Sequence, residues 1–237
     1  MKKILGVFAH PDDETFGPGA TLAKYAAAGA TVDIIMATRG EGGENNLIQK
    51  TNEPLGKIRE RELRNADKIL GVNQIDFLDY VDGELRQSIY FDIAKKIIAK
   101  IEIFKPDVII TFEPRGVSGH LDHIALSFIT TYAYLKTNIA KKLYYSCISD
   151  TARNQRGHEY FIYFPDGYSD KEITTRIDVG SSWETKKRAM HEHKTQIIDV
   201  TRIVKNMEQM PKVDNFILKY HRLSSLKLPE TDLFNGL

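Results

Sequence analysis

The 237-residue sequence has little of what marks a disulfide-rich, membrane-spanning or nucleic-acid-binding protein. Its single cysteine, Cys147, cannot form an internal disulfide and is interpreted as a small core residue. The 33 basic residues are balanced by 32 acidic ones, and this balance gives no sign of an electrostatic footprint for nucleic acid. No run approaches the roughly 20 apolar residues of a membrane span. We therefore expect neither a nucleic acid nor a membrane as partner.

Nucleotide-binding motifs are absent as well. No Gly-x-Gly-x-x-Gly follows the first predicted strand and no Walker-type lysine loop occurs, so neither a dinucleotide nor a nucleoside triphosphate is expected. Two lysines and a short apolar run at 4–8 superficially look like a signal peptide. That run is too short and leads straight into His10 and Asp13, so we expect the protein in the cytoplasm.

What the sequence does contain is an alternation of strand-like and helix-like segments. This alternation predicts a mostly parallel sheet with right-handed crossovers. Strands are expected at 3–9, 31–37, 75–79, 107–113 and 142–149. Helices are expected near 18–28, 57–70, 88–104, 122–136 and 182–195.

After residue 150 the alternation weakens. Segments 159–164 and 173–179 are predicted to be antiparallel strands around a turn at 165–167, and the tail at 201–237 is predicted to be helical in part. The length fits one domain over 1–237. The expected fold class is a Rossmann-like three-layer α/β sandwich with a mostly parallel sheet and a C-terminal antiparallel and helical extension.

The first chemical motif is at residues 9–14, which read Ala-His-Pro-Asp-Asp-Glu and follow the apolar run. Adjacent carboxylates repel each other, so Asp12 beside Asp13 at the edge of a core favours a bound cation. Imidazole with carboxylate suits zinc or another first-row metal such as Fe²⁺. A catalytic zinc takes three protein ligands, of which this segment supplies His10 and one aspartate. The alternative is a strand-end turn with a polar helix cap.

A source for the third ligand is residues 116–123, Gly-Val-Ser-Gly-His-Leu-Asp-His, after the strand-like run 107–112. Ligands of open α/β sheets gather where strand order reverses, and the first and fourth strands are expected to flank that point. If His120 opens a helix capped by Ser118 or Gly119, His123 lies one turn further on and can share its face. A pairing of Asp122 with His120 then requires His120 in the helix cap. Alone, this motif fits a surface turn equally well.

Together, the two motifs, their order and their separation resemble the PIG-L/LmbE-like family of metal-dependent N-acetylglucosaminyl deacetylases. Other segments that resemble the family extend the similarity over 3–197; they are 38–44, 59–63, 70–72, 78–83 and 193–196. The resemblance implies hydrolysis of an unactivated amide, which gives acetate and a free amine.

The resemblance also implies a role for each motif residue. His10, Asp13 and His123 would bind the metal, and water would fill the open position. Asp12 is adjacent to a ligand but not itself bound to the metal, so it would be the general base.

His120 would lie on the other side of the scissile amide. There it would stabilise the oxyanion as an imidazolium or protonate the departing amine, and Asp122 would orient and charge it. An amide nitrogen leaves badly without a proton, so the reaction needs both a base and an acid.

Arg59, Glu44 and Asp82 occupy positions at which the resemblance implies substrate contacts. Arg59 also suits a solvent-facing ion-pair lattice on its helix, Glu44 lies in a glycine-rich loop, and Asp82 also suits a simple turn. His193 is predicted either at the cleft wall or in the core, where its ring would donate to a backbone carbonyl.

Three functions fit the sequence. The first is a zinc-dependent hydrolase that removes the N-acetyl group from an N-acetylglucosamine-type sugar or glycoconjugate. The second is a metal-dependent amidase of a thiol-sugar conjugate. The third, of another class, is a non-catalytic Rossmann-like binding module with a structural metal, although such sites are normally closed by four protein ligands. The resemblance also allows a homo-oligomer.

Overall fold

The computed structural model describes residues 1–47, 51–87, 89–154 and 163–237. Its strands form one seven-stranded sheet in the order β3-β2-β1-β4-β5-β7-β6. They are β1 (Lys3–Phe8), β2 (Thr31–Thr38), β3 (Gln74–Tyr80), β4 (Val108–Phe112), β5 (Lys142–Cys147), β6 (Thr175–Asp178) and β7 (Val213–His221).

Strands β1 to β5 pair in parallel, whereas β7 is antiparallel to both of its neighbours, β5 and β6. The chain order reverses between β1 and β4, which lie side by side at the centre of the sheet. The prediction that the two motif-bearing strands flank this reversal is therefore confirmed. Both motifs follow carboxyl ends at the same edge of the sheet.

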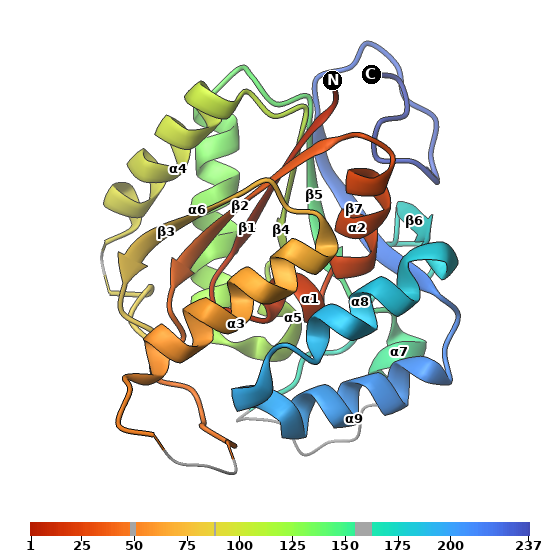
Figure 1. The fold of residues 1–237 in the computed structure, drawn as a ribbon. Helices are drawn as coiled ribbons and strands as arrows, with labels where there is room; N and C mark the ends of the chain where they lie inside the picture. Colours follow the sequence, from red (N-terminus) through yellow and green to blue (C-terminus); the bar gives the residue numbers. More distant parts are fainter. Residues whose placement is uncertain (48–50, 88, 155–162) are drawn as a thin grey trace.

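Helices cover both faces of the sheet (Figure 1). They are α1 (Asp13–Phe16), α2 (Gly19–Ala27), α3 (Leu55–Leu70), α4 (Tyr90–Phe104), α5 (Gly116–Gly119), α6 (Leu121–Lys136), α7 (Asp150–Asn154), α8 (Trp183–Met190) and α9 (Ile197–Glu208), with 3₁₀ turns at Gly180–Ser182 and Lys194–Gln196. Helices α4 and α6 lie on one face, and α2, α3 and α8 lie on the other. The expected three-layer α/β fold is confirmed.

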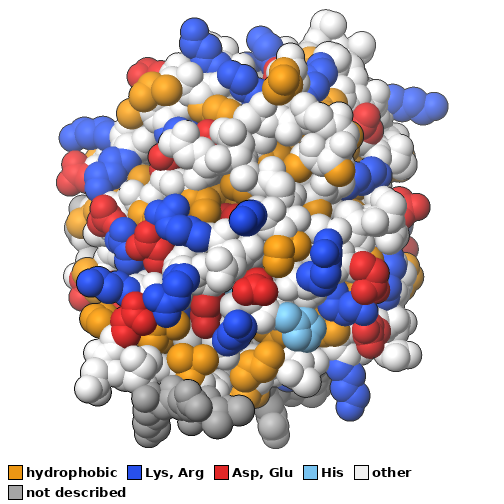
Figure 2. Space-filling view, in the orientation of Figure 1, with side chains coloured by type: hydrophobic (Ala, Val, Ile, Leu, Met, Phe, Trp, Pro, Cys, Tyr) orange, Lys and Arg blue, Asp and Glu red, His pale blue; other side chains and the backbone are white. Residues whose placement is uncertain are grey.

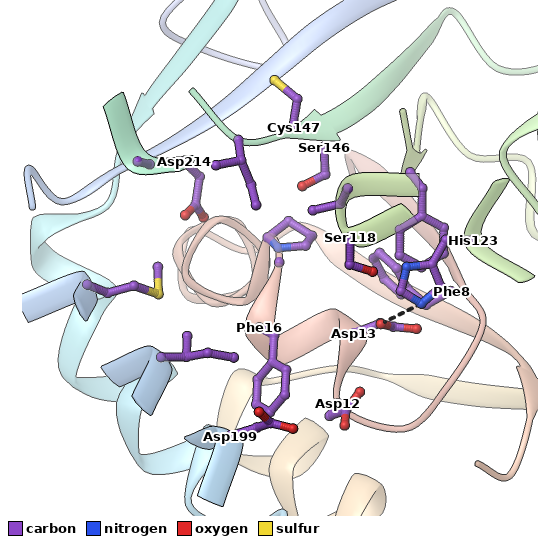
Figure 3. Close-up of a pocket in the computed structure, with 18 of the residues that line it drawn as sticks. Phe8, Asp12, Asp13, Phe16, Ser118, His123, Ser146, Cys147, Asp199 and Asp214 are labelled. Carbon is purple, nitrogen blue, oxygen red and sulfur yellow. Dashed lines mark ion pairs between the residues drawn. The ribbon is translucent and has the colours of Figure 1, made fainter. Parts of the chain in front are cut away.

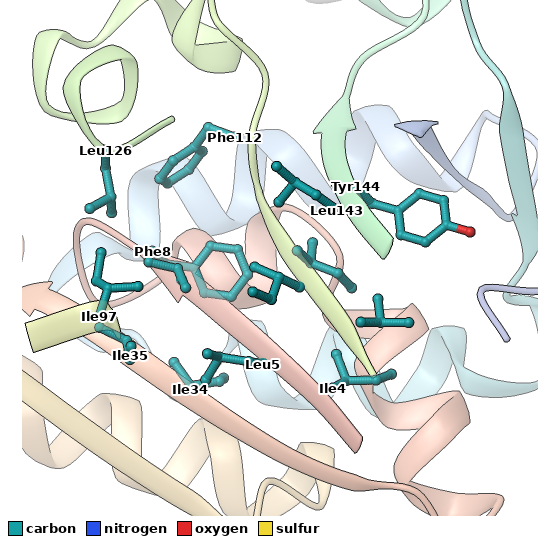
Figure 4. Packing of buried hydrophobic residues seen from close by; sticks show 14 of the residues in the cluster. Ile4, Leu5, Phe8, Ile34, Ile35, Ile97, Phe112, Leu126, Leu143 and Tyr144 are labelled. Atoms are coloured by element: carbon teal, nitrogen blue, oxygen red, sulfur yellow. The ribbon is translucent and has the colours of Figure 1, made fainter. Parts of the chain in front are cut away.

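The core runs through the central strands. Ile4, Leu5 and Phe8 of β1 are fully buried between the two helical layers (Figure 4). The ring of Phe8 meets that of Phe112 edge to face, with centroids 5.9 Å apart. Because burial of each such side chain contributes about 1.5–3 kcal/mol, the strands that carry both motifs are firmly held.

The C-terminal part differs in detail from the prediction. The expected strand 159–164 lies mostly outside the described residues, and 163–164 are not in a strand. The expected strand 173–179 exists as β6, and it pairs with β7. Strand β7 was not predicted, because its alternation of buried and exposed residues is incomplete and its last three residues are exposed.

None of the helices in the described residues combines the length and the apolar character needed to traverse a bilayer. On the face shown in Figure 2, basic and acidic side chains are interspersed rather than gathered by sign.

A buried ion pair fastens the C-terminal tail to the sheet. Lys142 at the start of β5 and Glu230 in the tail are both at most 1% exposed. The ammonium of Lys142 contacts the Glu230 carboxylate, and the Tyr144 hydroxyl donates to the same carboxylate at 2.7 Å. Removing one member leaves the other charge buried without compensation.

We expect Glu230→Ala to lower the free energy of unfolding by about 3–5 kcal/mol, since it leaves the Lys142 ammonium buried and unpaired. Urea unfolding measures this loss. The control is Asp92→Ala, which removes an exposed ion pair with Lys95 and should cost less than about 1 kcal/mol. Equal losses in the two variants would contradict the expectation.

Candidate active site

Side chains from the two motifs converge at the carboxyl ends of β1 and β4 (Figure 3). Nδ1 of His10 lies 3.2 Å from Nε2 of His123, although 113 residues separate them. The Asp13 carboxylate spans both rings, with one oxygen 3.2 Å from His123 Nε2 and the other 3.5 Å from His10 Nδ1. The three predicted metal ligands thus meet around one point.

Hydrogen bonds fix which nitrogen of each ring carries the proton. His10 Nε2 lies 2.9 Å from an Asp82 oxygen and 3.3 Å from an Asp122 oxygen, so Nε2 is the protonated nitrogen. His123 Nδ1 donates to the carbonyl of Gly116 at 3.0 Å. In the neutral rings, the lone pairs of His10 Nδ1 and His123 Nε2 therefore face each other, as metal ligands require.

His120 has the opposite arrangement. It is the N-cap of α6, and its Nδ1 accepts the backbone N–H of Asp122 at 3.2 Å. In the neutral ring Nε2 then carries the proton, so this side chain offers a hydrogen-bond donor rather than a metal-binding lone pair. Burial, reinforced by His10 and His123, lowers the pKa of His120 to about 4. His120 is thus itself the cap of α6, a position that the sequence left open, and Ser118 and Gly119 precede it in α5.

The Asp122 carboxylate does not have the contact that was predicted for it. Its carboxylate was expected to orient His120, but it accepts the N–H groups of Gly83 and Leu85 at 2.7 and 3.1 Å and contacts His10. Asp122 holds His120 through its backbone N–H instead. The physical reason is helix geometry, because the N–H of the second residue of a helix points at the cap side chain.

The charges around His10 fit a bound cation. Burial opposes protonation of His10, but hydrogen bonds to Asp122, Asp13 and Asp82 outweigh it and hold the pKa of the ring well above its usual value. Burial opposes ionisation of Asp13, yet the nearby rings, His123 first, hold its pKa well below the usual range. The buried cluster is therefore anionic and stabilised by positive charge.

Within the part of the chain that the structure describes, two groups of side chains have ligand atoms close enough to share one ion: His10, His120 and His123, and His10, Asp82 and Asp122. The second group meets at the protonated nitrogen of His10. In the first group the tautomers leave lone pairs on His10 and His123 only, and Asp13 supplies an oxygen between them. This mixed nitrogen and oxygen donor set fits a divalent first-row metal such as zinc.

Asp12 lies beside these donors and is held by Arg59. The guanidinium donates to an Asp12 carboxylate oxygen at 2.9 Å and to the carbonyls of Pro11 and Gly40 at 2.6 and 2.8 Å. Burial raises the pKa of Asp12 to about 7, against the opposing charge of Arg59. A carboxylate with a pKa near neutrality is suited to exchange a proton.

Arg59 does not belong to a solvent-facing lattice, since its side chain is 4% exposed. Solvent-facing ion pairs do involve other arginines of the same helix: Arg64 pairs with Glu60 on α3, and Arg61 pairs with Glu53 just before it. The regular Arg/Glu spacing alone could not distinguish the inward-facing arginine from the outward-facing ones.

The glycine-rich loop that contains Gly42, Gly43 and Glu44 lies next to this cluster. The Asp82 carboxylate accepts the N–H of Gly42 at 3.0 Å, which ties the loop to the site. Glu44 is exposed, and its backbone carbonyl accepts a hydrogen bond from the Gln196 side chain at 2.7 Å. Asp82 and Arg59 line the cavity, whereas Glu44 is not among the described residues that line it.

The cavity above the cluster has a volume of about 440 Å³, a size typical of small-molecule sites. Polar groups of the two motifs form one wall of the cavity, and the Phe16 side chain, drawn next to Asp199 in Figure 3, also lines it. Side chains of α9, including Ile203 and Met207, line its outer part. The cavity is thus open to a ligand larger than the reacting group.

Two functional neighbours were missed or misassigned from the sequence. The carboxylate of Glu14 accepts the backbone N–H of Asp12 at 3.0 Å, and its other oxygen lies 3.1 Å from His193 Nε2. Glu14 and His193 are both fully buried. His193 is therefore a core residue, as one alternative predicted, but its partner is a carboxylate instead of a backbone carbonyl.

Comparison with known proteins agrees with this geometry. Residues 5–134 match the family described as PIG-L: GlcNAc-PI de-N-acetylase. The chain belongs to the PIG-L family. The predicted family is therefore confirmed, and both motifs lie inside the matched region.

Relatives of this PIG-L family protein include deacetylases of 1D-myo-inositol 2-acetamido-2-deoxy-alpha-D-glucopyranoside. The enzyme of Mycolicibacterium vanbaalenii is 33% identical over 234 residues, covering 82% of this chain and 81% of the relative. That of Saccharomonospora viridis is 28% identical over 276 residues, covering 99% of this chain and 100% of the relative.

Solved structures of similar fold have more than one activity. N,N'-diacetylchitobiose deacetylase from Pyrococcus horikoshii aligns with a TM-score of 0.65 at 19% identity, covering 91% of this chain and 82% of that one. GalB, the 4-carboxy-2-hydroxymuconate hydratase from Pseudomonas putida, aligns with a TM-score of 0.69 at 18% identity, covering 96% and 100%. These likenesses show the fold, and the site must indicate the reaction.

We expect the PIG-L family protein to retain about one zinc ion per chain after dialysis, as a three-ligand site does. His123→Ala should lose the ion, because it removes a lone pair aimed at the metal. His120→Ala should keep it, since that ring offers an N–H. Elemental analysis of folded protein measures the difference, and loss of zinc from His120→Ala alone would contradict the ligand assignment.

Proposed function

We propose that this protein is a zinc-dependent hydrolase that removes the N-acetyl group from an N-acetylglucosamine-type sugar or glycoconjugate. The observation that carries the proposal is the arrangement in one cavity of two facing imidazole lone pairs, a buried carboxylate with a pKa near 7 and an imidazole N–H donor. The deacetylase relatives support the same reaction.

His10, Asp13 and His123 would hold the metal. When bound, the ion supplies Lewis acidity, which makes water a better nucleophile at neutral pH and polarises a carbonyl. The remaining steps belong to the residues around it.

Asp12 is the general base of this proposal. Its carboxylate takes the proton of the attacking water, and the hydrogen bond from Arg59 fixes the direction in which that carboxylate points. Glu14 holds the backbone of Asp12 from the other side. The base is thus oriented by two buried groups.

His120 faces the acetyl group from the opposite side. Its Nε2–H donates to the oxygen on which negative charge develops, and the backbone of Asp122 keeps the ring in the tautomer that can donate. The proton gained by Asp12 is available for the departing amine.

Arg59, Asp82 and Glu44 are the proposed substrate contacts. The cavity lining supports the first two. Glu44 belongs to the same loop as Gly43, which lines the cavity. We place the enzyme in the cytoplasm, which its single, buried cysteine supports.

Acetate release from a panel of N-acetylated sugars tests the reaction. The panel includes N-acetylglucosamine, its inositol glycoside and N,N'-diacetylchitobiose, with one thiol-conjugate amide as a competing substrate. We expect release of acetate that stops on chelation and returns with added zinc. Cleavage of the thiol-conjugate amide alone would instead favour the amidase reaction.

Asp12→Asn should keep its zinc and lower kcat by about 10²–10⁴-fold, because an amide keeps the shape of the side chain but cannot take a proton. The control is Asp92→Asn on α4, which should leave kcat unchanged. A zinc-loaded Asp12→Asn variant with wild-type kcat would rule out this base.

A further inference from the structure

The turn between β4 and α6 carries both histidines of the second motif and has an unusual backbone. Three of its residues have positive φ: Gly116 at 73°, Val117 at 61° and Gly119 at 79°. Glycine adopts such values without steric cost, but a β-branched residue does not. Val117, with ψ of −54°, lies in the region of the γ-turn that is rare and strained. Another interaction must hold it there.

Glu113 supplies that interaction. This residue follows β4 directly, and its side chain is 2% exposed. One carboxylate oxygen accepts the N–H of Val117 at 2.6 Å, and the other accepts the N–H of Arg115 at 2.7 Å. The Tyr168 hydroxyl donates to this second oxygen at 2.5 Å. The buried carboxylate thus accepts three hydrogen bonds, two of them from the backbone of the turn.

One peptide group connects Glu113 to His123. The N–H of Val117 and the carbonyl of Gly116 belong to the same planar unit and point in opposite directions. The N–H is bound by Glu113, and the carbonyl accepts the Nδ1–H of His123 at 3.0 Å. Phe112 stacks on one face of the His123 ring, with centroids 4.1 Å apart and planes 4° from parallel. Rotation of that peptide would withdraw the acceptor that sets the tautomer of His123.

We propose that Glu113 is a positioning residue of the metal site: it holds the 116–117 peptide so that the Gly116 carbonyl keeps His123 Nε2 directed at the metal. Tyr168 supports Glu113 from a segment outside the matched family region. The inference rests on the proposed zinc site, and it adds a residue that is not itself one of the proposed ligands.

The test measures the zinc dissociation constant of folded protein by competition with a chelator. In Glu113→Gln, one amide oxygen cannot accept from two backbone N–H groups and a hydroxyl, so the strained Val117 relaxes and the peptide rotates. We expect zinc to bind about 10–100-fold more weakly, as when other groups that orient a metal ligand are lost.

Adding Val117→Gly to Glu113→Gln should recover part of the lost affinity, because glycine tolerates the positive φ and removes the drive to rotate. Val117→Gly alone should bind zinc nearly as the wild type does. The matched control is Glu230→Gln, which alters another buried carboxylate close to the start of β5, at the end away from the site. It should lower stability and leave zinc affinity unchanged.

Wild-type zinc affinity in Glu113→Gln would overturn the inference and leave the proposed function intact. So would failure of Val117→Gly to recover any affinity, or equal weakening in Glu230→Gln, since either result would make Glu113 a general stability residue. If the wild type itself bound no zinc, the proposed function would fail first.

Discussion

The position of His10 between two sets of acidic groups is the constraint on which the site depends. Asp82 and Asp122 contact one ring nitrogen, and Asp13 and His123 face the other. These groups come from the ends of β1 and β3 and from the first turn of α6, so one imidazole joins three separate elements. So many carboxylates can be buried together only beside positive charge, which a proton on His10 supplies in the absence of an ion.

The matched family region and the later part of the chain supply different groups to the site. The matched region, residues 5–134, supplies the groups that would act on substrate and metal. The later part supplies side chains that hold those groups from behind: His193 contacts Glu14, Tyr168 binds Glu113, and the hydroxyl of Thr195 donates to Glu62 on α3 at 2.6 Å. Through these contacts, segments next to β6, α8 and α9 hold side chains of the matched region in place.

Local spacing was enough to predict the central features. Apolar runs before each motif indicated β1 and β4, the alternation of elements placed them at the strand reversal, and the spacing of His120 and His123 indicated the start of a helix. The predictions that failed depended on the direction in which a side chain points or on a partner far away in the sequence. The spacing could not show that the Asp122 carboxylate turns toward His10, and the pairing of Glu14 with a residue 179 positions away leaves no local pattern. Strand β7 was missed because it is partly exposed and is recognisable mainly by its partners.

The turns that follow β1 and β4 and carry the two motifs are built in the same way. Each contains a non-glycine residue with positive φ, Asp12 at 121° and Val117 at 61°. Conformations of this kind cost about 1–3 kcal/mol each and persist only where their surroundings enforce them. In each turn, a buried glutamate accepts the N–H of the strained residue, Glu14 for Asp12 and Glu113 for Val117.

Each glutamate is in turn bound by a side chain from the C-terminal part, His193 in one case and Tyr168 in the other. Strain of this size is small beside the stability of the core, but it is concentrated where the reacting groups must be aimed. A relaxed turn would form more easily and would leave the base and the metal ligand free to rotate. The backbone is therefore strained at Asp12 and Val117, after the ends of β1 and β4. Side chains from the C-terminal part of the chain prevent these two turns from relaxing.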